Sequence, residues 1–282
     1  MLAALFLAPA ALFVVGVIAY PLALEGWLSL TNASPGNDGS FVGLANYRYV
    51  LGQSVYRQAL QNTAVYVISS TLLKGLLGLA MAFALAKDFR GRRLVYALCF
   101  LPFVFPASIG TAAWYYLLSN VHGALNYGLL SAHLIRSQIA FLGSGPGPMI
   151  SVVTVNVWHG TALFGILCLA ALRSIPADLH DAAATDGARG LQRFLFVQLP
   201  LLRPALLLAG ILSVVGNFGD FPIIYLLTGG GPLGKTDIVS TYAFETALNA
   251  GDIGGAAAIA LSVVPLYILV LVLAFRLLDT ER

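Results

Sequence analysis

Six apolar runs dominate this sequence, and each is long enough to cross a bilayer as an α-helix. A transmembrane helix needs about 20 mostly apolar residues, whereas a transmembrane strand alternates in polarity over about 10 residues. The runs here are continuous rather than alternating, which favours helices. We place the spans at residues 2–30, 60–86, 94–118, 149–172, 205–227 and 253–278.

Charged side chains are scarce along the whole chain. They make up 10% of the residues, against about 25% in a soluble domain, and the mean hydropathy is +0.87. This composition indicates an all-α integral membrane protein with a single transmembrane domain over residues 1–282. The first run lacks the basic segment of a signal peptide, so we expect a retained helix. The two cysteines, Cys99 and Cys168, suggest neither a disulfide nor a metal site.

The basic residues predict which side of the membrane each connection faces. Six spans make the connections alternate, and ten of the fifteen Lys and Arg residues then fall on one side. The positive-inside rule assigns that side to the cytoplasm. We therefore expect both termini and the loop 173–204 in the cytoplasm, and a multi-pass protein of the inner membrane. Lys74 lies within the second span and receives no functional assignment. The ten are Lys87, Arg90, Arg92, Arg93, Arg173, Arg189, Arg193, Arg203, Arg276 and Arg282.

The loop 173–204 contains a polar segment with two expected helices. Pro176 suits the first position of a helix, and Gly187 suits its stop. A second helix is expected to end at Pro200 and Pro204, where the next span begins. The pattern predicts a helix–turn–helix on the cytoplasmic face, whose carboxylates can bind basic groups of a soluble partner. An amphipathic helix at the lipid surface is the alternative.

The spacing within this segment resembles the EAA loop of ABC importer permeases. That motif has Glu-Ala-Ala, then Gly after three residues, then Ile-x-Leu-Pro after nine more. Asp181 and Val197 replace the usual Glu and Ile. Similarities to sugar-importer permeases also occur at residues 41–47, 62–63 and 228–232. The residues that match the coupling motif are Asp181, Ala182, Ala183, Asp186, Gly187, Leu199 and Pro200.

This resemblance implies a type I ABC importer permease fold, similar to a smaller, six-span form of the larger maltose permease. The implied partners are a second homologous permease, two cytoplasmic ATPases and an external solute-binding protein, in addition to membrane lipid. The loop would sit in a cleft of an ATPase subunit. This chain would then be no enzyme and bind no cofactor, metal or nucleic acid, with ATP and magnesium held by the ATPases.

Polar residues within spans are costly and suggest a solute pathway. Ser213, Asn217 and Asp220 are spaced to share one helix face, and Asn156 lies near Trp158 and His159 in the fourth span. Such groups can bind sugar hydroxyls, although hydrogen bonds between helices are the alternative. Pro222 suggests a broken helix. By resemblance to the maltose permease, the solute contacts map to Trp158, His159, Gly160, Leu163, Ser213, Gly216, Asn217 and Asp220.

Leu163 and Gly216 stand where that permease has aromatic residues, and Asp220 replaces Asn, which implies another solute or pose. We expect a permease that carries a sugar, for example a di- or oligosaccharide such as trehalose or maltose, by alternating access. A glycerol-3-phosphate or polyol permease is an alternative, but a phosphate would favour basic residues within the spans. An ion-coupled secondary transporter would need intramembrane acids and an inverted repeat. An intramembrane enzyme would need a catalytic constellation that the spans do not show.

Overall fold

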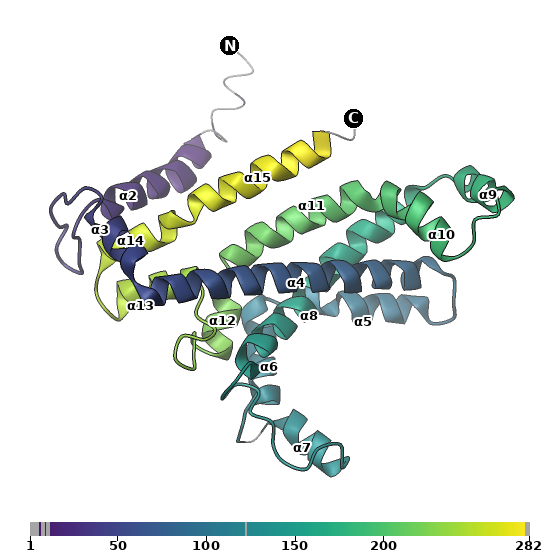
Figure 1. Ribbon diagram of the computed structural model, residues 1–282, viewed down its shortest axis with the longest axis horizontal. Helices are drawn as coiled ribbons and strands as arrows, with labels where there is room; N and C mark the ends of the chain where they lie inside the picture. The colour runs from purple at the N-terminus through teal and green to yellow at the C-terminus, as the bar shows by residue number, and fades with distance from the viewer. Residues whose placement is uncertain (1–5, 7–8, 10–11, 122, 280–282) are drawn as a thin grey trace.

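The computed structural model describes residues 6, 9, 12–121 and 123–279, and over them the fold is built from helices (Figure 1). Among the described residues, five helices are long and apolar enough to cross a membrane, and a bent pair of helices makes a sixth when it is taken as one span. Residues 2–5, 7–8 and 10–11 of the first expected span lie outside the described residues. The remaining part of that span is helical to Ser29.

The helices follow one another with short connections. Figure 1 places the turn between α4 and α5 at the same end as α9, and places α3, α13 and α14 at the opposite end. The segments that carry most basic residues are therefore gathered at one end. The bounds are η1 Val15–Ala19, α2 Tyr20–Ser29, α3 Ala45–Gly52, α4 Ser54–Ala86, α5 Arg92–Val104, α6 Ala107–Leu118, α7 Ala124–Ser131, α8 Gly147–Ser174, α9 Ala177–Thr185, α10 Leu191–Arg193, η2 Phe194–Gln198, α11 Leu199–Phe218, α12 Phe221–Leu227, α13 Val239–Leu248, α14 Ile253–Ser262 and α15 Val264–Asp279.

The centre of the fold is the pair of long helices α4 and α8, against which α11 packs. The close approach of α4 and α8 depends on small residues. A Cβ atom at Gly78 would lie 2.3 Å from Phe164 Cβ, and one at Gly165 would lie 1.8 Å from Met81 Cε. Membrane helices gain van der Waals contact where small residues let their backbones approach.

Replacing Gly78 with Ala should therefore destabilise the protein. The added methyl group meets the rigid Phe164 Cβ rather than a flexible side-chain end, and overpacking of this kind costs about 1–3 kcal/mol. We expect a lower melting temperature in detergent. Gly210→Ala on α11 is the matched control, because its added methyl group has no neighbour within 4 Å. Equal melting temperatures for the two variants would contradict this packing.

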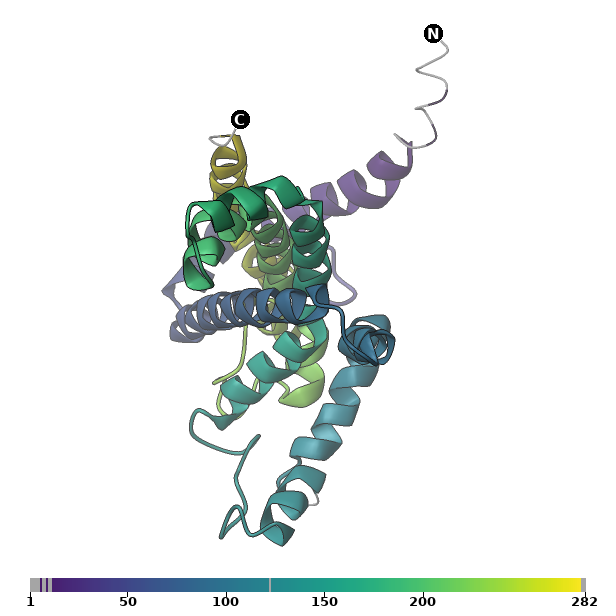
Figure 2. The same cartoon turned by 90° about the vertical axis from the view of Figure 1, so that its right-hand side faces the viewer.

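The span expected at 94–118 is not one straight helix. α5 and α6 meet at a bend of 100°, and α6 and α7 extend away from the α4–α8 pair (Figures 1 and 2). Pro106 is the cause, since proline disfavours the helical conformation in the residue before it. Phe105 is accordingly extended, with φ −76° and ψ 141°.

The expected helix end at Pro200 and Pro204 is wrong, because the chain stays helical from Leu191 to Phe218. Pro200 lies in the first turn of α11, directly after the π-helical turn η2. A π-turn shifts the hydrogen-bond register by one residue, which allows the helix to continue across a missing N–H group. The expected break near Pro222 is confirmed: α11 ends at Phe218, and α12 begins at Phe221.

The connection between α12 and α13 is held by buried polar groups. Asn62 Nδ2 donates to the carbonyl oxygens of Gly234 and Asp237, at 2.8 Å each. Thr241 Oγ1 donates to the Asp237 carboxylate. Burial raises the pKa of Asp237 from its ordinary 3.8 to about 6, against the opposing effect of the Thr241 hydrogen bond.

The raised pKa of Asp237 predicts a pH-dependent stability. A carboxyl whose pKa is higher in the folded state contributes stability below about pH 4, and that contribution is lost as the pH rises through about 6. Asp237→Asn should remove this dependence while keeping an acceptor for Thr241. The melting temperature of the wild type minus that of the variant should fall by about 2–4 °C between pH 5 and pH 7.5. A difference that stays constant or rises would contradict it.

Candidate functional site

Asn217 lies at the centre of a buried polar cluster between α4, α8 and α11. Its Nδ2 donates to Ser70 Oγ at 2.8 Å. Its Oδ1 accepts from Lys74 Nζ at 3.0 Å and from Asn156 Nδ2 at 3.1 Å. Lys74 Nζ also donates to Ser213 Oγ at 3.3 Å. The polar face of α11 that the sequence predicts is therefore hydrogen-bonded to polar residues of α4 and α8.

Asp220 extends this cluster at the break between α11 and α12. Its Oδ2 accepts from Tyr66 Oη at 2.6 Å and from Asn156 Nδ2 at 2.8 Å. The break turns the chain away from helical geometry at Asp220, which has ψ 84°. Discontinuous helices of this kind form binding sites in many transporters.

Most residues of this cluster, though not Tyr66 and Ser70, line a cavity of about 260 Å³, which we call the polar cavity. All the sequence-predicted solute residues except Trp158 line it, although they come from α8, from α11 and from the break after α11. Gly216 faces open space, since a Cβ atom there would meet nothing within 4 Å. The polar cavity is lined by Lys74, Phe103, Ala107, Asn156, His159, Gly160, Leu163, Phe164, Leu212, Ser213, Gly216, Asn217, Asp220 and Ile223.

Trp158 lies outside the polar cavity. One helical residue is a step of about 100°, so Trp158 points away from the direction of its neighbour His159. Its ring packs edge-to-face on Trp114, with centroids 5.9 Å apart, and lies against Gly110 on α6. In this structure Trp158 packs between α8 and α6, and its expected solute contact stays a prediction.

His159 lines the polar cavity and also contacts the bend between α5 and α6. Its Nε2 lies 3.2 Å from the carbonyl oxygen of Phe105, to which it donates when that nitrogen carries the proton. The carbonyl belongs to the residue where α5 ends, so it lacks a helical partner. His159 thereby connects the wall of the cavity to the bend.

Sequence reasoning missed the contribution of α4, namely Tyr66, Ser70 and Lys74. They recur every four residues and therefore share one helix face. The same spacing argument that grouped Ser213, Asn217 and Asp220 would have found them. Within the described part of the chain, no cluster of His, Cys, Asp and Glu residues forms a candidate metal site.

The expected coupling residues lie at the end of the molecule that carries α9 and α10 (Figure 1). Helix α9 stops at a glycine turn: Gly187 has φ +81°, and the Ala188 N–H donates to the Ala183 carbonyl at 2.9 Å. The expected stop at Gly187 is confirmed, and Pro176 precedes the first helical residue rather than occupying it. Ala183 is buried, Leu199 is partly buried, and Asp181, Ala182, Asp186, Gly187 and Pro200 are exposed.

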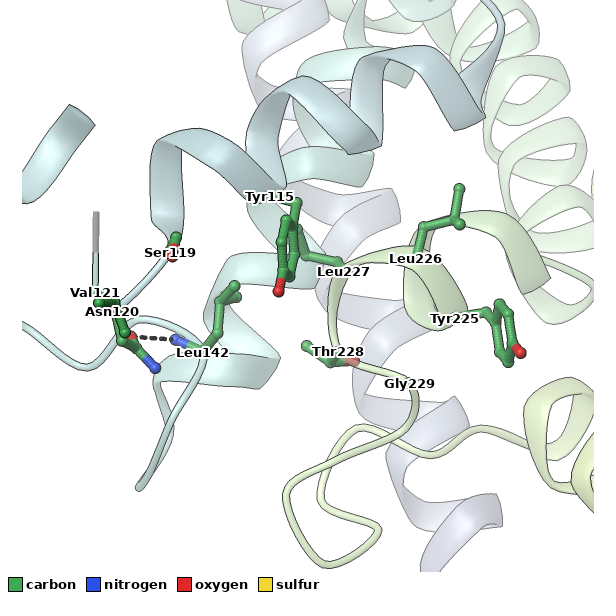
Figure 3. A pocket seen from close by; sticks show the side chains of 10 residues that line it. All are labelled: Tyr115, Ser119, Asn120, Val121, Leu142, Tyr225, Leu226, Leu227, Thr228 and Gly229. Carbon is green, nitrogen blue, oxygen red and sulfur yellow. Dashed lines mark hydrogen bonds between the residues drawn. The ribbon is translucent and has the colours of Figure 1, made fainter. Parts of the chain in front are cut away.

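A larger hollow of about 530 Å³ lies between the end of α6 and the end of α12 (Figure 3). Tyr115, Leu142 and Leu227 form its apolar side, and none of its lining residues is charged. None of the sequence-predicted solute residues lines it. The hollow also carries hydrogen-bonding side chains, on Ser119, Asn120 and Thr228, but the polar cavity differs from it in having charged side chains, Lys74 and Asp220.

Comparison with known proteins gives a family match over most of the chain. Residues 74–280 match the model of the binding-protein-dependent transport system inner membrane component. The chain is 36% identical to the trehalose/maltose transport system permease protein MalF of Thermococcus litoralis, covering 78% of this chain and 74% of the relative. It is 32% identical to the trehalose transport system permease protein SugA of Mycobacterium tuberculosis, covering 92% and 82%.

The fold also matches a solved structure. A chain of a bacterial ABC transporter involved in the import of the acidic polysaccharide alginate superposes with a TM-score of 0.83, at 20% sequence identity. The match covers 98% of this chain and 94% of that chain. The expected permease fold is thereby confirmed.

Proposed function

This chain belongs to the binding-protein-dependent transport system inner membrane components, and we propose that it forms half of the pore for a di- or oligosaccharide such as trehalose or maltose. It is a permease of the sugar ABC importer kind, located in the inner membrane with several spans. Beyond this family membership, we propose which solute is carried, where it binds and which partners complete the transporter. Relatives named for trehalose and maltose support the choice of solute.

The observation that carries this proposal is the mixture of groups around the polar cavity. Asn217, Ser213 and His159 offer neutral donors and acceptors, while Lys74 and Asp220 bring opposite charges. A sugar hydroxyl both donates and accepts hydrogen bonds, so a neutral, hydroxylated solute fits this set. We assign the polar cavity as this subunit's part of the solute site.

The proposed mechanism is alternating access driven by separate ATPase subunits. The coupling loop, residues 173–204, would enter a cleft of an ATPase in the cytoplasm, with Asp181 and Asp186 exposed for contact. Movement of the ATPases would pull α9 and the continuous helix from Leu191 to Phe218, whose far end carries Asn217. A second permease and an external binding protein complete the proposed assembly.

Co-purification followed by a sugar panel tests this function. The affinity-tagged chain, expressed with its neighbouring transport proteins, should bring down a second permease, an ATPase and a binding protein. The purified binding protein should bind a di- or oligosaccharide in calorimetry. Tight binding only of an amino acid, a peptide or a metal ion would contradict the proposal.

Lys74 favours one second candidate, a glycerol-3-phosphate permease, because it places a cation at the polar cavity. A phosphate would accept hydrogen bonds from its ammonium group. Asp220 lines the same cavity and would repel that phosphate, so this candidate ranks second. Glycerol 3-phosphate in the same panel distinguishes the two, since binding of it without binding of sugars would establish the second candidate.

A further inference from the structure

Lys74 is a buried cation without a carboxylate in contact. It is 5% exposed, and its ammonium group donates to two neutral acceptors, Ser213 Oγ and Asn217 Oδ1. An ammonium group has three N–H donors, and no third acceptor is found among the residues that the structure describes. A charge held this way inside a membrane protein is costly, which indicates a function.

Asn156 has an unused hydrogen-bond acceptor. It is also 5% exposed, and its Nδ2 donates to Asn217 Oδ1 and Asp220 Oδ2. Its Oδ1 is a buried acceptor with no hydrogen-bond partner within the described part of the chain. Buried polar atoms are normally hydrogen-bonded, so this atom can accept a hydrogen bond from a water molecule or a solute group.

The two residues with unused groups share a hydrogen-bond partner and a cavity. Lys74 Nζ and Asn156 Nδ2 donate to one shared atom, Asn217 Oδ1, and both residues line the polar cavity. Lys74 thus has an unused donor and Asn156 an unused acceptor, on two residues that line one cavity. A hydroxyl group uses both, because its hydrogen donates and its oxygen accepts. An anionic group would use only the donor and would face the Asp220 carboxylate.

We propose that Lys74 and Asn156 Oδ1 together bind one hydroxyl group of the transported solute, and that this pair selects hydroxylated over anionic solutes. The inference rests on the proposed function of the polar cavity and adds two residues to it. The hydroxyl group donates to Asn156 Oδ1 and accepts from Lys74 Nζ. The sequence left Lys74 without an assignment and named Asn156 only as one of several polar residues that can bind a sugar hydroxyl.

Gly160 positions Lys74 in this arrangement. A Cβ atom at Gly160 would lie 2.6 Å from Lys74 Cε and 2.9 Å from Nζ. The lysine side chain is flexible, so Gly160→Ala displaces its ammonium group rather than unfolding the helix pair. Gly160→Ala and Lys74→Met should therefore impair the same contact by different routes.

The test pairs variants with solutes that lack one hydroxyl group. Complete transporters with each variant are reconstituted in liposomes, and ATP-driven uptake of the sugar and its monodeoxy analogues is measured at saturating, loaded binding protein. Lys74→Met and Gly160→Ala should lower uptake of the parent sugar about tenfold, the usual effect of losing a hydrogen bond to a charged group. For one deoxy analogue, both variants should match the wild type.

The control variant is Gly210→Ala, whose added methyl group meets nothing within 4 Å. It should transport every solute as the wild type does. An equal loss across all analogues would mean that Lys74 is only structural and would overturn the inference. Should Lys74→Met fail to assemble, Gly160→Ala alone decides. Failure of the wild type to transport any sugar would instead refute the proposed function.

Discussion

Replacement of Gly187 with Val is expected to uncouple ATP hydrolysis from transport and to lower sugar uptake about tenfold or more. Gly187 has φ +81°, and an L-residue in the left-handed region costs about 1–2 kcal/mol, more for a β-branched one. The turn that ends α9 is then lost, and the coupling loop cannot keep its shape against the ATPase. The measurement is uptake together with solute-stimulated ATPase activity in reconstituted transporters.

The control for this prediction is Gly91→Val. Gly91 has φ +85° and open space around its Cβ position, so its backbone strain is matched to that of Gly187. It precedes α5 at the α4–α5 turn, outside the coupling motif. Coupling should be kept in Gly91→Val. If uptake and stimulated ATPase activity in Gly187→Val equal those of the wild type, residues 173–204 do not form the coupling element.

Asp220→Ala is expected to lower sugar uptake about tenfold or more while the transporter still assembles. The change leaves Tyr66 Oη and Asn156 Nδ2 without their shared acceptor, and a lost hydrogen bond to a charged group costs about 1.5–3 kcal/mol. It also removes the negative charge that opposes Lys74. Uptake rate against sugar concentration measures the effect, and co-purification of the partners measures assembly.

Two further variants sharpen the Asp220 prediction. Asp220→Asn keeps an acceptor for Tyr66 but removes the charge, so it should be milder for a neutral sugar. Asp38→Ala removes an exposed carboxylate from the connection between α2 and α3 and should leave uptake unchanged. Normal uptake kinetics in Asp220→Ala would refute the assignment of the polar cavity to the solute.

The pattern of the sequence was sufficient where a local rule decides the structure. The apolar run at 149–172 lies within α8, and the helical spacing correctly grouped Ser213 and Asn217 on α11. Asp220 lies just past the end of that helix, in the break before Pro222. Gly187 ends α9 because a left-handed residue terminates a helix in the same way in any context.

The features that the sequence did not predict depend on contacts between helices. The same residue type has opposite results at two places: the chain bends by 100° at Pro106 but stays helical at Pro200, which follows the π-helical turn η2. The spacing of Tyr66, Ser70 and Lys74 puts Lys74 on a polar helix face, but the sequence does not show which helix that face meets. Its partners, Ser213 and Asn217, lie on another helix.

Uptake into proteoliposomes that contain the purified transporter tests the central claim most directly. The account predicts that a radiolabelled di- or oligosaccharide accumulates only when ATP and magnesium are on the ATPase side and binding protein is on the opposite side. Ionophores that remove proton and sodium gradients should have no effect. Sugar uptake that needs an ion gradient and proceeds without ATP would contradict the account.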